Sequence, residues 1–160
     1  AIRRMLDRLE KDRARARERG APPPVAGDVE AKKKRLSWPV RGTVVSEFGF
    51  EVHPRYGTRV PQNGIDIAAP EGTPILAVAA GSVVYVAWLP GYGRTVILDH
   101  GGGFYTLYAH ASSFAVRRGD HVTPGQSIAQ VGDTDSMRGP CLHFEVRQGE
   151  KALNPREWLE

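Results

Sequence analysis

The sequence predicts a mainly β domain with a largely antiparallel sheet, preceded by a helical arm. From Leu36 onward, short apolar runs rich in Val, Ile and Tyr are separated by glycine-containing turns, a pattern typical of strands. Residues 2–19 instead place apolar side chains at helical spacing among charged residues and alanine. Because strand-like runs do not alternate with helix-like ones, the pattern favours an antiparallel sheet over a parallel one.

Residues 1–20 are expected to form the helical arm. Ile2, Met5, Leu6 and Leu9 are spaced as one face of a helix, and a glycine followed by three prolines ends it. Because this apolar stripe is too narrow to form a core alone, the arm needs something to pack on. We expect either the end of a coiled coil that packs on a partner helix or a helix that lies on the domain; a solvated, charged helix is the remaining alternative.

Residues 21–36 are predicted to be a linker and residues 37–160 the folded domain. The linker contains three prolines and the basic run Lys32–Arg35. Residues 1–36 hold 12 Lys and Arg against 6 Asp and Glu, whereas the remainder holds 10 against 12. The net charge of +4 therefore belongs to the arm and linker. The domain lacks the clustered basic and aromatic residues of a nucleic-acid-binding protein, so that class is excluded.

The domain is expected to contain eight short strands. Gly101–Gly103 would close a hairpin, because successive glycines supply the positive φ that tight turns require. The predicted strands are Thr43–Phe48, Gly64–Ala68, Ile75–Ala79, Ser82–Trp88, Arg94–Asp99, Phe104–His110, Ser127–Val131 and Leu142–Arg147.

Membrane spans and disulfides find no support in the sequence. No apolar run reaches the roughly 18 residues that a membrane span needs, and the N-terminus lacks the apolar stretch of a signal peptide. We therefore expect the sequence to be part of a longer chain. Cys141 is the only cysteine, which excludes an internal disulfide.

The segment Gln62–Pro74 (QNGIDIAAPEGTP) carries the strongest functional signal. Asp66 lies between two isoleucines, so alternation along a strand points its carboxylate away from them and into a cleft. Nearby, Pro70–Val84 and Val116–Val131 both place turn glycines around short β runs. This repeat resembles the duplicated hybrid motif of wall-active zinc endopeptidases and of biotinyl or lipoyl carrier domains. A carrier needs an exposed lysine at a hairpin tip, and the domain's only lysine, Lys151, lies outside the repeat.

From Ser37 to Leu159 the chain resembles the LytM, or lysostaphin-like, zinc metallopeptidase domain. The resemblance runs through separate motifs in the family's order: SEFGFEVHP, GIDIAAPEGTPI, LDHGGGFYTLYAH, VTPGQSIAQVGDT, LHFEVR and NPREWL. Active members carry H-x-x-x-D, a later histidine after Y-x, and H-x-H. In these members the first histidine, the aspartate and the last histidine bind zinc, and the other two histidines act on the water.

Carried over to this chain, the resemblance assigns Asp66 and His143 as residual zinc ligands and His110 as the mid-chain catalytic histidine. Gln62 stands where the first zinc-binding histidine is expected, and Cys141 replaces the first histidine of H-x-H. A catalytic zinc needs three protein ligands and an open position for water, and a neutral amide is a poor substitute for imidazole. A thiol also cannot replace an imidazole in proton transfer near neutral pH. We therefore expect no enzymatic activity and no cofactor.

Cys141 leaves two other chemistries open. As a thiolate it could bind zinc, and with His110 nearby it could act as a nucleophile. The family, however, uses only the second histidine of H-x-H for metal, which is His143 here. No oxyanion donor or third orienting group is recognisable, so a small buried thiol is the simplest interpretation.

The degenerate LytM domains of EnvC-type murein hydrolase activators share the features in which this chain departs from active members. These activators combine an N-terminal coiled coil with a catalytically inactive domain. Their non-histidine residue before GIDIAAPEGTP, WLPGYG (Trp88–Gly93) and the NPREWL ending recur here. The resemblance implies a non-catalytic activator of peptidoglycan amidases in cell division, in the periplasm or cell envelope, whose coiled coil is linked to a membrane-embedded division regulator. The amidase would bind the degenerate groove, formed by Gln62, Asp66, Tyr92, His110, Cys141 and His143.

Two other functions stay open. A zinc-dependent peptidoglycan endopeptidase with an altered ligand set would have to bind zinc and cleave cross-bridges. A peptidoglycan-binding module would bind sacculi and leave amidase rates unchanged. Tyr56, Tyr92 and Tyr108 are expected either to line the groove or to belong to the core.

Overall fold

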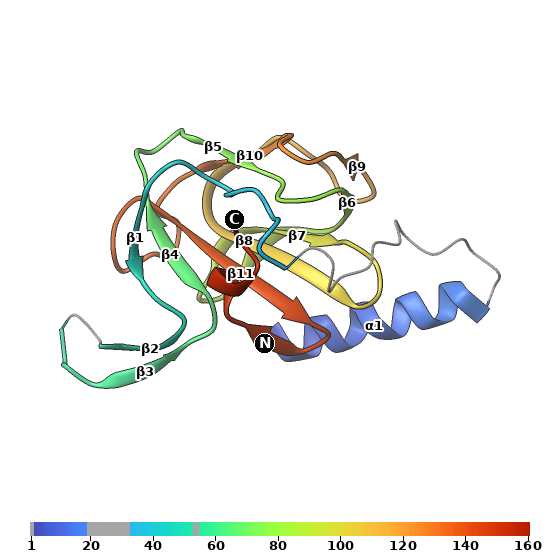
Figure 1. Cartoon of the computed structure of the whole chain (residues 1–160), viewed down its shortest axis with the longest axis horizontal. Coiled ribbons are helices and arrows are strands. Elements are labelled where there is room, and N and C mark those ends of the chain that lie inside the picture. The colour runs from blue at the N-terminus through green and yellow to red at the C-terminus, as the bar shows by residue number, and fades with distance from the viewer. Residues whose placement is uncertain (1, 19–32, 53–54) are drawn as a thin grey trace.

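The computed structural model of the chain describes residues 2–18, 33–52 and 55–160. It contains the predicted arm helix, α1 (Ile2–Glu18), followed by a mainly antiparallel β domain, which confirms the predicted fold class (Figure 1). Residues 19–32, which include most of the predicted linker (21–36) and the end of the predicted arm, lie outside the described residues.

A ten-stranded sheet forms the domain, and all eight predicted strands belong to it. Its main path runs β1-β4-β11-β8-β7-β6-β9, and β5, β10 and β12 pair at its margins. The structure adds four strands that were not predicted, β2, β3, β9 and β12, and the 3-10 helix η2. The bounds are β1 Thr43–Ser46, β2 Gly49–Val52, β3 Arg59–Gln62, β4 Ile65–Ala68, β5 Pro74–Leu76, β6 Gly81–Leu89, β7 Gly93–Asp99, β8 Phe104–Phe114, β9 His121–Val122, β10 Ser127–Val131, β11 Cys141–Gln148, β12 Lys151–Leu153 and η2 Pro155–Glu157.

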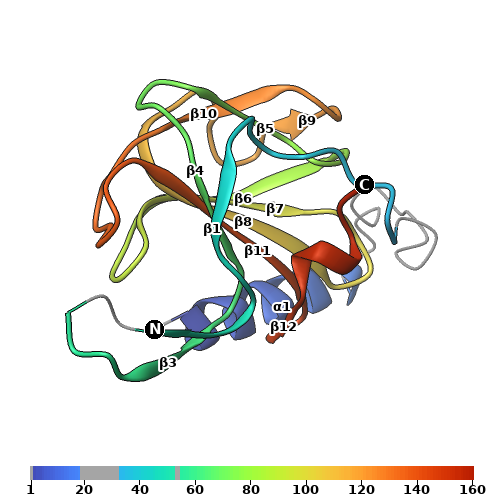
Figure 2. The same ribbon diagram turned by 60° about the vertical axis from the view of Figure 1, so that its left-hand side comes forward.

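The β2–β3 hairpin escaped prediction because its sequence argues against strands. Pro61 lies within β3, and proline is confined to edge strands because it cannot donate to the ladder. Gly49 opens β2 with a φ of 116°, which only glycine adopts readily. The two strands pair only with each other and project beside the main sheet (Figures 1 and 2). Gln62 is the last residue of β3, so this hairpin places one wall of the site described below.

Alternation along β11 gives the sheet two different faces. Leu142, Phe144 and Val146 are fully buried in the main hydrophobic core. The residues that alternate with them point to the opposite face of the sheet, and these are His143, Glu145 and Arg147. That second face therefore carries polar and charged side chains on its central strand.

The arm helix α1 covers part of this second face. Met5 and Leu6 are buried there, and the stripe is completed by the partly buried Ile2 and Leu9. Figures 1 and 2 both show α1 lying against the sheet rather than extending away from it. Of the alternatives for the arm, the structure thus shows a helix that lies on the domain. The residues that it packs against are Val84, Tyr85, Leu89, Tyr92, Ile97, Tyr105, Leu107 and Ala109.

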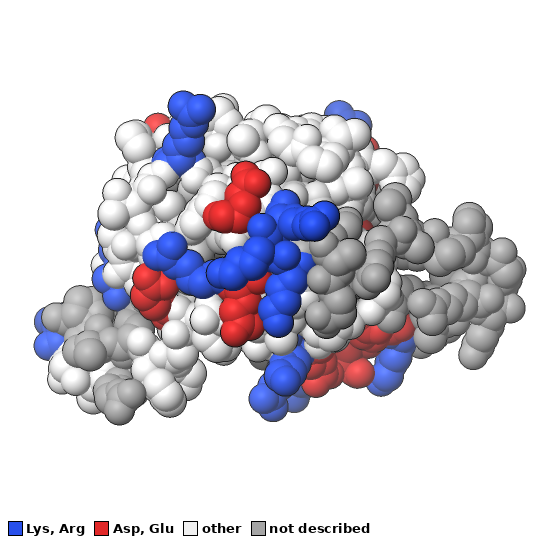
Figure 3. Space-filling view, in the orientation of Figure 1, with Lys and Arg blue, Asp and Glu red and all other residues white. Residues whose placement is uncertain are grey.

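The C-terminus is tied to the start of the domain. Leu36 forms a parallel bridge with Leu159, and the Trp38 indole nitrogen donates to the Glu160 carbonyl at 2.8 Å. On the face shown in Figure 3, several basic side chains gather near the middle, and acidic side chains lie directly beside them. Arg156, for example, makes a two-point contact with Glu47 at 3.0 and 3.1 Å. Among the described residues, no helix has the length and apolar character needed to cross a membrane.

Candidate functional site

A cavity of about 260 Å³ opens on the polar face of the sheet, next to the end of β3. Strands β4, β8 and β11 form its floor, and the loops after β6 and β10 form its far wall. Its lining residues are Pro61, Gln62, Asn63, Asp66, Gly91, Tyr92, His110, Asp135, Ser136, Met137, Arg138, His143 and Glu145. The cavity therefore contains five of the six residues predicted for the groove.

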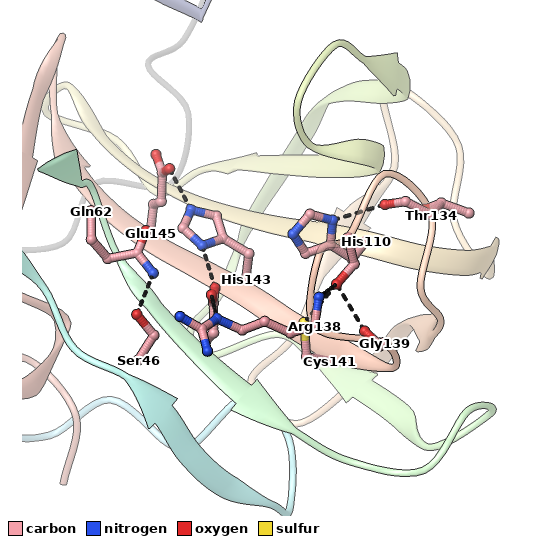
Figure 4. A network of polar contacts seen from close by, with 11 residues as sticks. Ser46, Gln62, His110, Thr134, Arg138, Gly139, Cys141, His143 and Glu145 are labelled. Carbon is pink, nitrogen blue, oxygen red and sulfur yellow. Dashed lines mark hydrogen bonds and ion pairs between the residues drawn. The ribbon is translucent and has the colours of Figure 1, made fainter. Parts of the chain in front are cut away.

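Strand register brings the central residues together. Asp66 lies directly opposite His143 because β4 pairs with β11, and β8 places His110 beside them. The Nδ1 atom of His143 is 2.7 Å from Asp66 Oδ1, and the two histidine rings are 6.0 Å apart. Three residues far apart in the sequence thus meet in the lining of the cavity, and Figure 4 shows two of them, His110 and His143, side by side.

His143 is held between two carboxylates. Its Nε2 atom is 2.7 Å from Glu145 Oε2, and the other oxygen of Glu145 accepts a hydrogen bond from Arg147 Nε at 2.6 Å. Burial alone would lower the pKa of His143, but the hydrogen bonds to Asp66 and Glu145 outweigh burial and raise it to about 10. Burial would raise the pKa of both carboxyl groups, yet pairing with His143 lowers it. Asp66, His143 and Glu145 therefore form a row of ionised side chains in the cavity lining. Arg147 continues this row beyond the lining.

His110 reaches the cavity through an irregularity in β8. It adopts a φ of 66°, rare outside glycine, and the register of β8 against β10 shifts beside it. Its Nδ1 atom donates to the Thr134 carbonyl at 2.8 Å, so a neutral ring carries its proton on Nδ1. Burial lowers the pKa of His110, and the nearby charge of His143 lowers it further. His110 is thus held as a neutral imidazole next to a charged one.

The remaining predicted groove residues have different surroundings. The Gln62 amide nitrogen donates to Ser46 Oγ at 3.0 Å, and the Tyr92 ring lies 5.5 Å from the His143 ring. Burial, together with the charge of Glu145, raises the pKa of the Tyr92 hydroxyl. Cys141 does not line the cavity: it is 1% exposed, and its sulfur lies 3.5 Å from Ser136 Oγ in the covering loop.

Sequence reasoning missed three charged residues of the site. Glu145 and Arg147 were detectable, because they share with His143 the positions that alternate with the apolar Leu142, Phe144 and Val146. Arg138 was not, since it lies in a loop whose course the sequence does not fix; its Nε atom is 3.6 Å from Asp66 Oδ2. The open question about the tyrosines also has an answer: Tyr108 belongs to the core, and Tyr56 is 70% exposed.

Comparison with known proteins identifies the family. Peptidase family M23 matches residues 60–155. The chain belongs to this family. It is 37% identical over 133 residues to the murein hydrolase activator EnvC of Escherichia coli, which covers 83% of the chain and 31% of that relative. It is also 37% identical over 131 residues to the cell division protein DipM of Caulobacter vibrioides, covering 81% of the chain and 21% of the relative.

One similar solved structure is described as a peptidase. The zinc-containing peptidase of Vibrio cholerae matches with a TM-score of 0.68 and 32% identity, over 78% of this chain and 40% of that one. Membership of the M23 family is therefore shared with activators and with peptidases. The chain spans only about a third and a fifth of the lengths of EnvC and DipM, respectively.

The zinc ion that the family implies does not fit the side chains of this cavity. Gln62 offers only a neutral amide oxygen, a poor zinc ligand, and its amide nitrogen donates to Ser46 Oγ. Both ring nitrogens of His143 are bonded to carboxylates, and both oxygens of Asp66 contact cationic groups. Among residues 2–18, 33–52 and 55–160, no three His, Cys, Asp or Glu side chains are grouped as a metal site. The two remaining ligands, Asp66 and His143, are thus engaged with each other.

Proposed function

We propose that this chain is a non-catalytic activator of cell-wall amidases in cell division and that the amidase binds the degenerate groove. The observation that carries the proposal is the state of the former metal position. Gln62 replaces a ligand, and the remaining ligands, Asp66 and His143, are paired with each other. A cavity of this kind keeps its shape and its polar lining without a metal, which suits a docking surface. The relatives named as an activator and as a cell division protein support the same function.

The surface around the cavity suits a helix or an extended peptide. Met137 is 65% exposed on its wall, so an apolar contact is available beside the buried charges. The adjoining face of the sheet already accepts one amphipathic helix, α1. Tyr92 contributes both to the cavity and to the cluster under α1, so an incoming helix and the arm would compete for neighbouring surface. We therefore propose that the docked arm restrains amidase binding until it is displaced.

Activation requires that the amidase state with an open active site binds the groove more tightly than the closed state. A partner that binds both states equally shifts no population, however tightly it binds. In this proposal the helical arm links the domain to a membrane division regulator, and the protein acts in the periplasm or cell envelope. Displacement of the arm would then connect the regulator to the amidase.

The test is the rate at which a cognate amidase digests purified sacculi, measured with residues 1–160, with residues 37–160 and without either. We expect stimulation, and more of it from residues 37–160. Met137→Glu should reduce the apparent affinity by roughly tenfold or more, because it buries a charge at a central apolar contact. The matched control is Arg117→Glu, on an exposed turn outside the cavity lining. Unchanged amidase rates with every version of the chain would contradict the proposal.

A zinc-dependent endopeptidase is the second candidate, and one observation favours it. His110 keeps an unprotonated Nε2 in the cavity beside His143, as a catalytic base would require. Clearing of sacculi by this chain alone in the presence of zinc would support this candidate and contradict the activator. Binding to sacculi without either effect would indicate a peptidoglycan-binding module.

A further inference from the structure

Arg138 places a fixed positive charge at the carboxylate that would otherwise bind the metal. Its Nε atom lies 3.6 Å from Asp66 Oδ2, while Asp66 Oδ1 lies 2.7 Å from His143 Nδ1. The Asp66 side chain is only 10% exposed, and Arg138 adds a second cationic contact to the one that His143 makes. We propose that Arg138 is a built-in counter-cation that excludes divalent metal from the groove independently of the change at Gln62.

The loop that carries Arg138 is organised to hold it there. The Arg138 backbone nitrogen donates to Ser136 Oγ at 3.1 Å, and that hydroxyl donates to the Gly139 carbonyl at 2.8 Å. Asp135 fixes the same loop to the opposite wall, since its carboxylate accepts from the Gly91 nitrogen at 2.7 Å. Figure 4 shows the Arg138 side chain extending from this loop towards His143. The guanidinium is therefore held over the floor of the cavity.

Electrostatics explains why this position matters. An arginine stays protonated under all ordinary conditions, so its charge does not disappear when a metal approaches. A divalent ion bound to Asp66 would lie a few ångströms from the guanidinium, at a site screened only weakly by water. Metal binding would require Arg138 to leave as well as Asp66 and His143 to separate. Replacing Gln62 by histidine, which completes the family's three ligands, should therefore not restore tight zinc binding.

The inference concerns metal binding alone and does not depend on an amidase partner. Arg138 can turn out not to exclude zinc even if the chain stimulates the amidase. Equally, the chain can fail to stimulate the amidase even if Arg138 excludes zinc, so each proposal can be contradicted without the other. Zinc affinity is measured by equilibrium dialysis with metal analysis, together with the absorption spectrum of bound cobalt. The chains compared are Gln62→His, Gln62→His with Arg138→Met, and Gln62→His with Arg138→Lys. Thermal unfolding is recorded for each to confirm a folded domain.

We expect Gln62→His with Arg138→Met to bind zinc about 100-fold or more tightly than Gln62→His alone, because one unit of positive charge has been removed. Arg138→Lys keeps that charge and should leave zinc binding weak. The matched control, Gln62→His with Arg117→Met, should behave like Gln62→His because Arg117 is not in the cavity lining. Equal zinc affinities for Gln62→His with and without Arg138→Met would overturn the inference. Tight zinc binding by the unchanged chain would overturn it as well.

Discussion

Replacing Glu145 by glutamine tests the row of ionised side chains from Asp66 to Arg147. Glu145 is fully buried and contacts His143 at 2.7 Å and Arg147 at 2.6 Å. At an effective dielectric constant of about 20, each unit-charge contact at about 4 Å is worth roughly 4 kcal/mol. The regained hydration of the carboxylate offsets part of this, so we expect a net loss of about 3–5 kcal/mol. For a domain of this size that loss lowers Tm by roughly 10 °C.

The assay is urea unfolding at neutral pH for Glu145→Gln, Arg147→Met and the double variant. If Glu145 and Arg147 act as a pair, the double variant should lose clearly less than the sum of the two single losses. Thr123→Ala, in an exposed turn away from the cavity, provides a matched polar control. A loss below about 1 kcal/mol for Glu145→Gln, or strictly additive losses, would refute the pairing within this row of ionised side chains.

Two further predictions concern His143 and the arm. The pKa of His143 is raised from 6.5 to about 10 on folding, so its stabilising effect is complete below about pH 6.5 and lost as the pH rises towards 10. Ring-nitrogen NMR at pH 8 should find His143 protonated and His110 neutral; a neutral His143 would refute this assignment. Leu6→Ala removes a buried contact worth about 2–5 kcal/mol and should release α1 from the sheet. Faster amide exchange in α1 and stronger amidase stimulation are expected, and Arg4→Ala, on the exposed face of the helix, should change neither.

The strands were predictable from the sequence because each needs only local information. Alternation and turn glycines located all eight predicted strands, and the stripe from Ile2 to Leu9 located α1. The hairpin of β2 and β3 was missed because Pro61 contradicts the usual strand pattern. What α1 packs on could not be decided, since the same narrow stripe suits a coiled coil or a sheet.

The site was predictable only where a motif fixes the residue. Gln62, Asp66, His110 and His143 were found through the family's spacing, and the strand register explains why they meet. Arg138 was missed because a loop residue's direction depends on contacts that join it to distant segments, such as the Asp135 contact with Gly91. The prediction that Cys141 belongs to the groove stays untested, and the structure places this residue behind the loop instead of in the cavity lining.

We propose that the groove is a docking surface and no longer a metal-dependent active site. Its most direct test is the clearing of purified sacculi in zinc-containing buffer by this chain alone, by a cognate amidase alone and by the two together. We expect no clearing by the chain alone and a faster rate for the mixture than for the amidase. Clearing by the chain alone, with no stimulation of the amidase, would contradict the claim.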